Sequence, residues 1–501
     1  MIKTVQLNVR SIPFDLFPTA QDLCAQINRQ SFAWRHADDY LFGFGQALRY
    51  DIAGCAPQNH ATHQVAADNR FALADIWWKE LSAQSNIDDR AGVSGSGLIA
   101  FGSFSFTAQS SAGSALIVPR LLLGRRSGKT WLTQIWRDGE NTPEIPISGA
   151  GLIQQIERIK HDDPCLRTPN AQPAAKFTAP QTPRLPKFKT SQKKKFLPAP
   201  TPQKMQITPL PSEKIWMEQV AKASSLIQKG ELNKVVLSRS IELNFPNPLS
   251  LPAFIDHLHR KYRDTWVFAI DGIVGASPEM LAQTDFSNDP ANRIHCRVLA
   301  GTKPLRTTLA PLTSTNSHTA AAHTEFDLET SEKDISEHRI AVDSAVSVLS
   351  EFGALEIGAP YILRLPNVEH FATDIYTTLA PEHSLFTVIA KLHPTAALGG
   401  SPREKALAVI ARLESHDRER YGAPVGWISQ GESGNCGQWA IALRCCGLSP
   451  HLHSATAWAG GGIMGDSISE RELAETRAKF APILNALSAQ FPKYSDQLHS
   501  C

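Results

Sequence analysis

Two short apolar runs joined by Asp271-Gly272 constrain the fold of this chain more than any other local feature. The runs cover residues 265–270 and 273–276, and both are rich in β-branched and aromatic side chains. Asp-Gly between two such runs is typical of a two-residue β-hairpin turn. The sequence therefore predicts antiparallel pairing at this point, which a fold built only from helices cannot contain.

Helical and strand patterns are mixed on both sides of this hairpin. Short strands are expected within 97–118, a second hairpin within 121–133 around Ser127-Gly128, and further strands at 234–237, 425–428, 439–445 and 454–459. Helices are expected at 213–229, 331–352 and 469–488. Gly230 is expected to end the first helix, and Ser331 with Asp334 has capping-box spacing at the start of the second. Because helices and antiparallel hairpins do not alternate regularly, the pattern favours the α+β class over a doubly wound sheet.

Composition narrows the possible functions. The 501 residues carry 42% hydrophobic and 20% charged residues, and the formal net charge is +2. This balance is typical of a globular protein, and it disfavours a nucleic-acid coat or a membrane-surface binder. Eight cysteines without a C-x-x-C pair fit neither a zinc ribbon nor a disulfide framework. With no spanning segment or secretory signal recognised, we expect a cytoplasmic protein without nucleic-acid or membrane partners.

A basic, proline-rich segment at 164–211 divides the chain. It holds 11 of the 33 prolines, and Lys187, Lys189 and 193–195 form a lysine cluster without acidic neighbours. Proline removes backbone donors, so we interpret 164–211 as an exposed connector between residues 1–163 and 212–495. A solvated linker is favoured over a polyanion contact.

Two glycine motifs look like nucleotide sites and are not predicted to be so. Gly124 to Thr130 has three residues between its glycines where a P-loop needs four. Gly460 to Gly465 matches G-x-G-x-x-G, but the chain after it is too short for the rest of a dinucleotide unit. The strip 460–462 could still bind a carboxylate or phosphate through backbone N–H groups beside a helix start.

Two acidic pairs share a face of two expected helices at i,i+3 spacing. They are Asp334 with Glu337 and Glu472 with Glu475. Such oxygen ligands suit Mg²⁺, although a solvated acidic face is the ordinary alternative. Lys479, one turn beyond Glu475, is either its ion-pair partner or a contact for a substrate anion.

Lys234 and Glu279 each allow two interpretations. Lys234 opens a strand that should be buried, so it is either a strand-end residue facing water or a buried base with a lowered pKa. Glu279 follows Ser277-Pro278 at the end of a hairpin strand. In a partly apolar pocket, its carboxyl would stay protonated and act as an acid.

Nine segments, in order, resemble those of one enzyme family. They are 232–239, 275–279, 299–302, 333–339, 393–400, 421–426, 441–444, 459–463 and 472–479. Over about residues 213–487 the chain resembles the chorismate-utilising enzymes, which include isochorismate and salicylate synthases and the synthase subunits for anthranilate and aminodeoxychorismate. The resemblance implies a large α+β domain with two packed antiparallel sheets and helices outside. A weaker echo at 101–106 and 118–120 places 1–163 in the same fold and makes 212–495 the catalytic region.

The resemblance also implies roles for the charged residues. Lys234 would activate a water for attack at ring C2 of chorismate, and Glu279 would protonate the departing C4 hydroxyl. Glu337 and Glu475 would hold Mg²⁺, with Asp334 and Glu472 as outer acidic neighbours. The implied substrate contacts are Thr302, His393, Ala397, Tyr421, Arg444, Gly460 and Lys479.

Ala397 and Lys234 point to one branch of the family. This chain resembles isochorismate synthases in having alanine at position 397, where relatives that transfer ammonia or form salicylate carry threonine. The relatives that use ammonia also generally lack the lysine base. We therefore expect the isochorismate-forming branch, an isomerase without an obligatory protein partner. Salicylate synthase, an ammonia-dependent enzyme and a silent chorismate-binding subunit remain as alternatives. Gly399 and 304–306 depart from the family pattern, which leaves the geometry of those loops open.

Overall fold

The strands form two large sheets in the computed structural model, which describes residues 5–16, 18–52, 69–162, 204–284, 293–304, 332–366, 368–431 and 434–499. The larger sheet has the spatial order β10 (Gln206–Leu210), β11 (Lys234–Asn244), β23 (Ser454–Ile463), β22 (Cys445–Leu448), β13 (Ile273–Ser277), β12 (Trp266–Ile270), β2 (Phe32–His36), β3 (Asp39–Phe44), β8 (Leu121–Arg126), β9 (Lys129–Arg137), β1 (Leu7–Pro13) and β5 (Asn86–Asp89), with β19 (Gly400–Ser401) beside β11.

The smaller sheet runs through β16 (Leu355–Ile357), β18 (Val368–Thr378), β15 (Arg293–Pro304), β14 (Met280–Thr284), β21 (Gly434–Ile441), β20 (Pro424–Gly431), β6 (Leu98–Ser103), β7 (Ser114–Val118) and β4 (Leu48–Ile52), with β17 (Tyr361–Arg364) beside β18. The helices are α1 (Ala20–Ala25), α2 (Arg70–Gln84), α3 (Gly149–Asp162), α4 (Glu213–Gln228), α5 (Leu251–Lys261), α6 (Glu332–Leu349), α7 (Leu385–Leu392), α8 (Arg403–Leu413), α9 (Ser469–Gln490) and α10 (Ser495–His499), with a 3₁₀ turn at Pro492–Tyr494.

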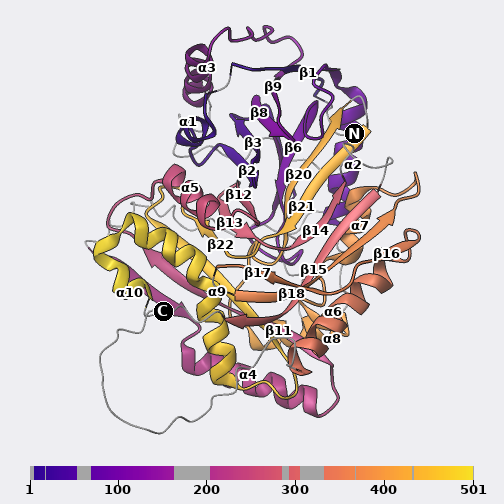
Figure 1. Cartoon of the computed structure of the whole chain (residues 1–501), viewed down its shortest axis with the longest axis vertical. Helices are drawn as coiled ribbons and strands as arrows, with labels where there is room; N and C mark the ends of the chain where they lie inside the picture. The colour runs from indigo at the N-terminus through magenta and orange to yellow at the C-terminus, as the bar shows by residue number, and fades with distance from the viewer. Residues whose placement is uncertain are drawn as a thin grey trace, which may run out of the picture.

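Neighbouring strands pair antiparallel in both sheets, apart from the parallel pair β1–β5. Buried side chains from the two sheets share one core, to which Trp34 of β2, Phe101 of β6 and Trp439 of β21 contribute. The helices lie outside: α6 and α7 pack on the smaller sheet, and α5 and α9 on the larger one (Figure 1). The expected α+β fold with two packed antiparallel sheets is confirmed.

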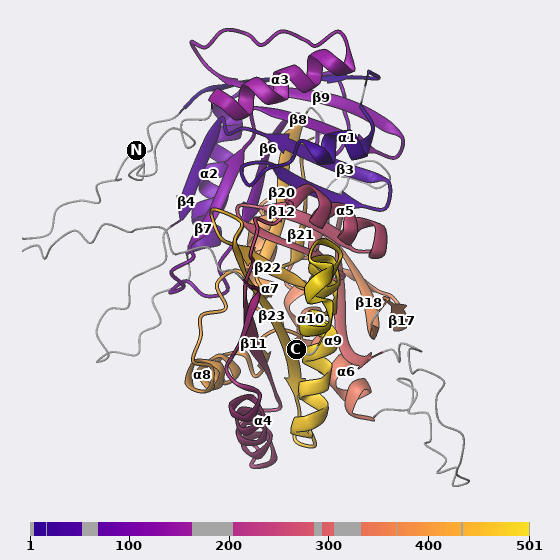
Figure 2. The ribbon, with the colours of Figure 1, turned by 90° about the vertical axis from the view of Figure 1, so that its left-hand side faces the viewer.

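Strands from the N-terminal residues are built into both sheets. In the larger sheet β2 pairs with β12, and in the smaller sheet β6 pairs with β20. Figure 2 shows α3 and α4 at opposite ends of the long axis, with the interleaved strands between them. Residues before and after the connector therefore share one fold.

Both predicted two-residue hairpin turns are present. Asp271 and Gly272 have φ values of 51° and 84°, the left-handed pair that joins β12 to β13. Ser127 and Gly128 do the same between β8 and β9, with φ values of 48° and 80°. The P-loop-like sequence at Gly124 to Thr130 is therefore a hairpin.

Two local predictions were wrong. The expected strand 439–445 is broken, because β21 ends at Ile441 and the backbone turns through Arg444 (φ 46°) before β22 begins. The glycine strip 460–462 is not beside a helix start: it is the end of β23, paired with β11, and α9 begins at Ser469. A strand in a ladder uses its backbone groups for pairing, so this strip is not a helix-terminal anion site.

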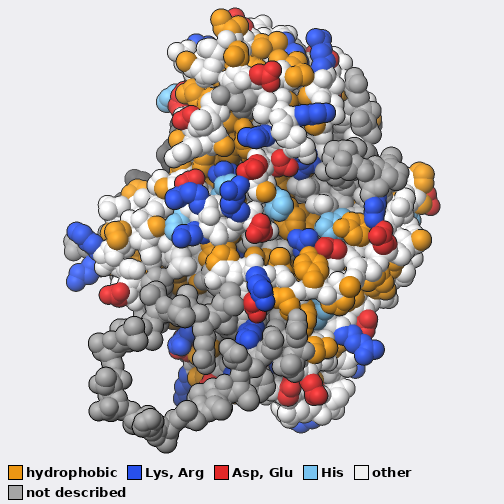
Figure 3. All heavy atoms as spheres, in the orientation of Figure 1, with side chains coloured by type: hydrophobic (Ala, Val, Ile, Leu, Met, Phe, Trp, Pro, Cys, Tyr) orange, Lys and Arg blue, Asp and Glu red, His pale blue; other side chains and the backbone are white. Residues whose placement is uncertain are grey.

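The end of the connector is ordered as a strand. Gln206–Leu210 forms β10, which pairs with β11. Residues 164–203, which include the lysine cluster, lie outside the described residues, as does Ser331. In the described ranges, no helix has the length and apolar character needed to cross a membrane. Acidic and basic side chains are interspersed on the face shown in Figure 3.

Candidate active site

The glycine strip 460–462 forms the floor of the site. It pairs with residues 236–238 of β11. A Cβ atom added to Gly462 would overlap Glu337 Oε1 and lie 3.0 Å from Lys234 Cε, and one on Gly461 would lie 3.1 Å from Glu472 Oε2. Glycine is required here because the carboxylates approach the backbone where a side chain would otherwise stand.

Three carboxylates converge on this strip, and each pairs with a lysine. Glu337 comes from α6, and Glu472 and Glu475 come from α9. We call these three residues the carboxylate cluster. The pairs are Lys234 Nζ to Glu337 Oε1 at 3.0 Å, Lys333 Nζ to Glu472 Oε1 at 2.6 Å, and Lys479 Nζ to Glu475 Oε1 at 2.5 Å.

The lysines set the charge of the cluster. Burial alone would raise the pKa of Glu337, but the ammonium groups of Lys234, Lys333 and Lys479 together hold it below its usual value. Burial and the charge of Glu475 raise the pKa of Glu472 to about 7, against the opposing effect of Lys333. Glu472 Oε2 is buried and receives no hydrogen bond from any described residue.

The donor types of the cluster fit a hard divalent cation. Carboxylate oxygens are the ligands that Mg²⁺ prefers, and Glu472 Oε2 is a buried acceptor without a hydrogen bond from the described residues. As the side chains lie, however, no three His, Cys, Asp or Glu residues of the described chain have a spacing that could hold a metal ion. Each carboxylate is instead turned toward its lysine, so the lysines would have to give way to an ion.

A cavity opens beside the cluster. The predicted residues that line it are Glu279, Thr302, Glu337, Ala397, Tyr421, Arg444, Gly460 and Lys479. Lys234 is fully buried behind the wall, at its ion pair with Glu337. The fold thus gathers residues that are up to 245 positions apart in the sequence.

Glu279 is the buried acid of the cavity. Its side chain follows β13, and its pKa is raised to about 8 by burial, against the lowering effects of Lys234 and Arg444. The backbone N–H of Glu279 donates to Ser277 Oγ at 3.2 Å, which fixes the turn. At neutral pH this carboxyl is protonated, the state in which it can donate a proton.

His370 is a cavity residue that was not predicted from the sequence. It lies on β18, where Nδ1 is 3.0 Å from Thr302 Oγ1 and Nε2 is 2.8 Å from Arg444 Nη2. Arginine only donates, so Nε2 accepts and Nδ1 carries the proton. Burial and the charge of Arg444 push the pKa of His370 well below its usual value, which agrees with a neutral ring. The contacts of His370 depend on the register of β18 with β15, which could not be predicted from the sequence.

Arg444 and Tyr421 present donors to the same space. Burial lowers the pKa of Arg444, yet a guanidinium stays charged in proteins, and burial raises the pKa of the Tyr421 phenol. Lys479 Nζ also donates to Gly460 O at 2.9 Å. This wall of the cavity is therefore suited to an anionic ligand.

Two of the predicted residues, His393 and Asp334, are not among those that line the cavity. His393 does not line the cavity: its ring packs edge-on against Phe71 and Phe106, and Nε2 is 2.9 Å from Phe106 O. Aromatic packing at the end of α7 thus fixes the orientation of this ring. Asp334 Oδ1 accepts from the Thr302 backbone N–H at 3.3 Å, so this carboxylate supports the β15 turn.

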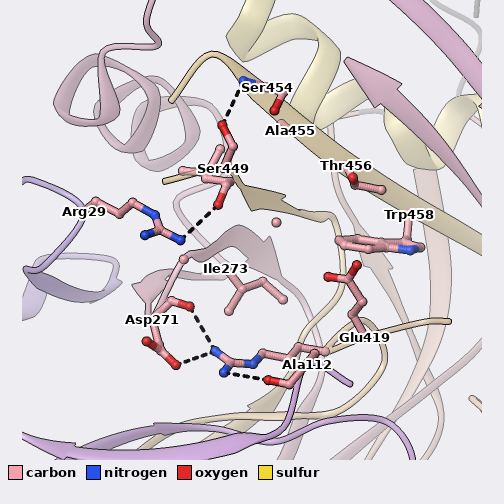
Figure 4. Close-up of a pocket in the computed structure, with 14 residues that line it drawn as sticks. Arg29, Ala112, Asp271, Ile273, Glu419, Ser449, Ser454, Ala455, Thr456 and Trp458 are labelled. Carbon is pink, nitrogen blue, oxygen red and sulfur yellow. Dashed lines mark hydrogen bonds and ion pairs between the residues drawn. The ribbon is translucent and has the colours of Figure 1, made fainter. Parts of the chain in front are cut away.

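A second cavity is lined by residues that include Arg29, Asp271, Glu419 and Trp458 (Figure 4). Its lining includes Trp458, whose ring stacks on Tyr421 with 6.3 Å between centroids. Arg420 is held there by Asp271 and by Ala112 O. None of the predicted catalytic or metal residues lines this second cavity.

Comparison with known proteins agrees with the arrangement. The family model described as chorismate binding enzyme matches residues 24–488. The isochorismate synthase MenF of Bacillus subtilis is 33% identical over 285 residues, which are 55% of this chain and 56% of that relative. The vibriobactin-specific isochorismate synthase of Vibrio cholerae is 28% identical over 362 residues, 68% of this chain and 84% of that relative.

A solved structure shares the fold. The menaquinone-specific isochorismate synthase MenF of Escherichia coli superimposes with a TM-score of 0.65 at 22% identity, covering 97% of this chain and 95% of that one. The match to the family model covers most of the chain and includes both walls of the cavity. The chain therefore belongs to the chorismate binding enzyme family.

Proposed function

We propose that this protein is an isochorismate synthase, an isomerase that converts chorismate to isochorismate with Mg²⁺. The observation that carries the proposal is the composition of one cavity. A carboxyl with a pKa near 8, Glu279, shares it with Arg444 and with Glu337, the ion-pair partner of Lys234. An acid, a base and an anion clamp are the groups that this reaction needs.

Lys234 and Glu279 divide the proton transfers. In its neutral amine form, Lys234 takes a proton from the water that attacks ring C2, and Glu279 gives its proton to the hydroxyl that leaves C4. A C2–O bond forms, the C4–O bond breaks and the ring double bonds shift between them. One water is consumed and one is released, so substrate and product have the same mass.

The remaining charged groups bind the dianionic substrate. Glu337 and Glu475 would hold Mg²⁺, with Glu472 nearby, and the ion would oppose the negative charge of the ring carboxylate. Arg444, Tyr421 and Lys479 face the same cavity and suit the enolpyruvyl carboxylate. His370 fixes Arg444 and Thr302 in place from behind.

Ala397 supports water rather than ammonia as the nucleophile. It lines the cavity with a methyl group where a threonine would add a hydroxyl beside the substrate. The similarity to isochorismate synthases of Bacillus subtilis and Vibrio cholerae points the same way.

The proposal is tested with the purified full-length protein, chorismate and Mg²⁺. Products are separated by chromatography and identified by mass. We expect a Mg²⁺-dependent product of the same mass as chorismate and a different retention time. Salicylate with released pyruvate would assign the lyase activity instead, an amine-containing product with ammonia would assign the amine-transferring activity, and no product under any of these conditions would leave only a binding role.

A further inference from the structure

The three lysines that pair with the carboxylate cluster differ in their freedom to move. The Lys234 side chain is 0% exposed, and Lys479 is held both by Glu475 and by Gly460 O. Lys333 stands in the first turn of α6 with 22% of its side chain exposed, and its ammonium contacts Glu472 Oε1. Lys333 is therefore the lysine that can swing into solvent without disturbing a strand or the cavity wall.

Glu472 is only partly satisfied by its neighbours. Oε1 accepts from Lys333 Nζ at 2.6 Å and from Ser467 Oγ at 2.7 Å. Oε2 faces Gly461 and receives no hydrogen bond within the described ranges, although the side chain is 1% exposed. A buried carboxylate oxygen without a donor is costly, so this position is suited to a further cation.

We propose that Lys333 is the counter-cation of the metal-free carboxylate cluster and that Mg²⁺ displaces its ammonium from Glu472. This inference rests on the proposed function and gives a role to a residue that the reaction itself does not require. An ammonium and a divalent cation compete for the same cluster of carboxylates, and an ion held among Glu337, Glu472 and Glu475 would repel the Lys333 ammonium. The exposed side chain of Lys333 gives the ammonium a route outward.

The proposal has consequences of a definite sign. Without the Lys333 charge, the repulsion between the neighbouring Glu472 and Glu475 is no longer offset in the metal-free protein, which should unfold at a lower temperature. Mg²⁺ should then bind more tightly, because it has no ammonium to displace. A lysine that served only to orient Glu472 for the metal would give the opposite sign, since its loss would weaken Mg²⁺ binding.

The experiment uses the full-length protein and its Lys333→Met variant, both stripped of metal with EDTA. Thermal unfolding is followed while MgCl₂ is added at constant ionic strength. We expect K333M to have a lower melting temperature than wild type without Mg²⁺, and this difference should disappear when Mg²⁺ is added. K333M should reach half of its stabilisation by Mg²⁺ at a Mg²⁺ concentration about tenfold lower than wild type does. Lys333→Arg, which keeps the charge, should behave more like wild type.

Lys391→Met is the matched control, because it also removes a lysine from an ion pair, that with Glu351, at a site where both side chains are half exposed. It should leave the Mg²⁺ response unchanged. If the melting temperature of K333M lies below that of wild type by the same amount with and without Mg²⁺, or if K333M binds Mg²⁺ more weakly, Lys333 is not the counter-cation. The proposed function would not be affected by either result. If wild type itself shows no Mg²⁺ response and no Mg²⁺-dependent product, the metal in the proposed function fails and this inference fails with it.

Discussion

Lys234 and Glu337 form an ion pair in the interior, with 3.0 Å between Nζ and Oε1. The pair joins the first residue of β11 to the second turn of α6. In the proposed reaction these two residues have different tasks, one as the base and one as a metal ligand. A cation bound at Glu337 would compete with Lys234 for the same carboxylate, so metal binding and release of the base are linked in this geometry.

Replacing Lys234 by Gln should remove the base while keeping most of the side-chain volume. We expect kcat to fall by about 10²–10⁴, which is the usual contribution of a general base. Rates are measured with saturating chorismate and Mg²⁺. Lys222→Gln, on the exposed face of α4, is the control. A K234Q rate within threefold of wild type would show that another group is the base.

The role of Glu279 as the general acid predicts how kcat declines at alkaline pH. Its pKa of about 8 means that the proton needed by the leaving hydroxyl is present below that pH and is lost above it. We expect kcat to decline about tenfold for each pH unit above 8. Glu279→Gln should be strongly impaired and should lack this decline. A decline that survives in E279Q would assign it to a different residue.

The same shift predicts a pH dependence of stability. The pKa of Glu279 is near 8 in the folded chain and about 4.3 in an unfolded one, so between these values the folded state holds a proton that the unfolded state has released. Stability therefore falls as pH rises through this window, by at most about 1.4 kcal/mol per pH unit. The melting temperature of E279Q should gain on wild type between about pH 5 and 8. Parallel curves for the two proteins would contradict the shift.

The α+β class could be predicted from local signals, whereas the grouping of the site residues followed from the family resemblance of separated segments. The Asp271-Gly272 turn sets the β12–β13 hairpin, and the i,i+3 spacing placed Glu472 and Glu475 on one helix face. His370 could not be found this way, since its contacts with Thr302 and Arg444 depend on strand register and on the turn at Arg444. His393 was misplaced because sequence order does not reveal that Phe71 and Phe106 enclose its ring.

His370 should affect substrate binding through Arg444. Replacing it by Leu removes the acceptor for Arg444 Nη2 and the donor to Thr302, so the guanidinium loses its fixed position. We expect KM for chorismate to rise about tenfold with a smaller change in kcat. His370→Gln keeps an acceptor and should recover part of the loss. If H370L binds chorismate as wild type does, the hydrogen bonds to His370 do not position Arg444.

Gly462 should be the least replaceable glycine of the strip. An alanine Cβ there would overlap Glu337 Oε1 and crowd Lys234 Cε, so either the ion pair or the β11–β23 ladder must shift. We expect Gly462→Ala to lower the melting temperature and to abolish any stabilisation by Mg²⁺. Gly461→Ala should be milder, since its Cβ would lie 3.1 Å from Glu472 Oε2. Gly149→Ala, at the start of α3 where the nearest atom is 3.4 Å away, is the control. A G462A protein with wild-type stability and Mg²⁺ response would mean that the carboxylates do not need this close approach to the strand.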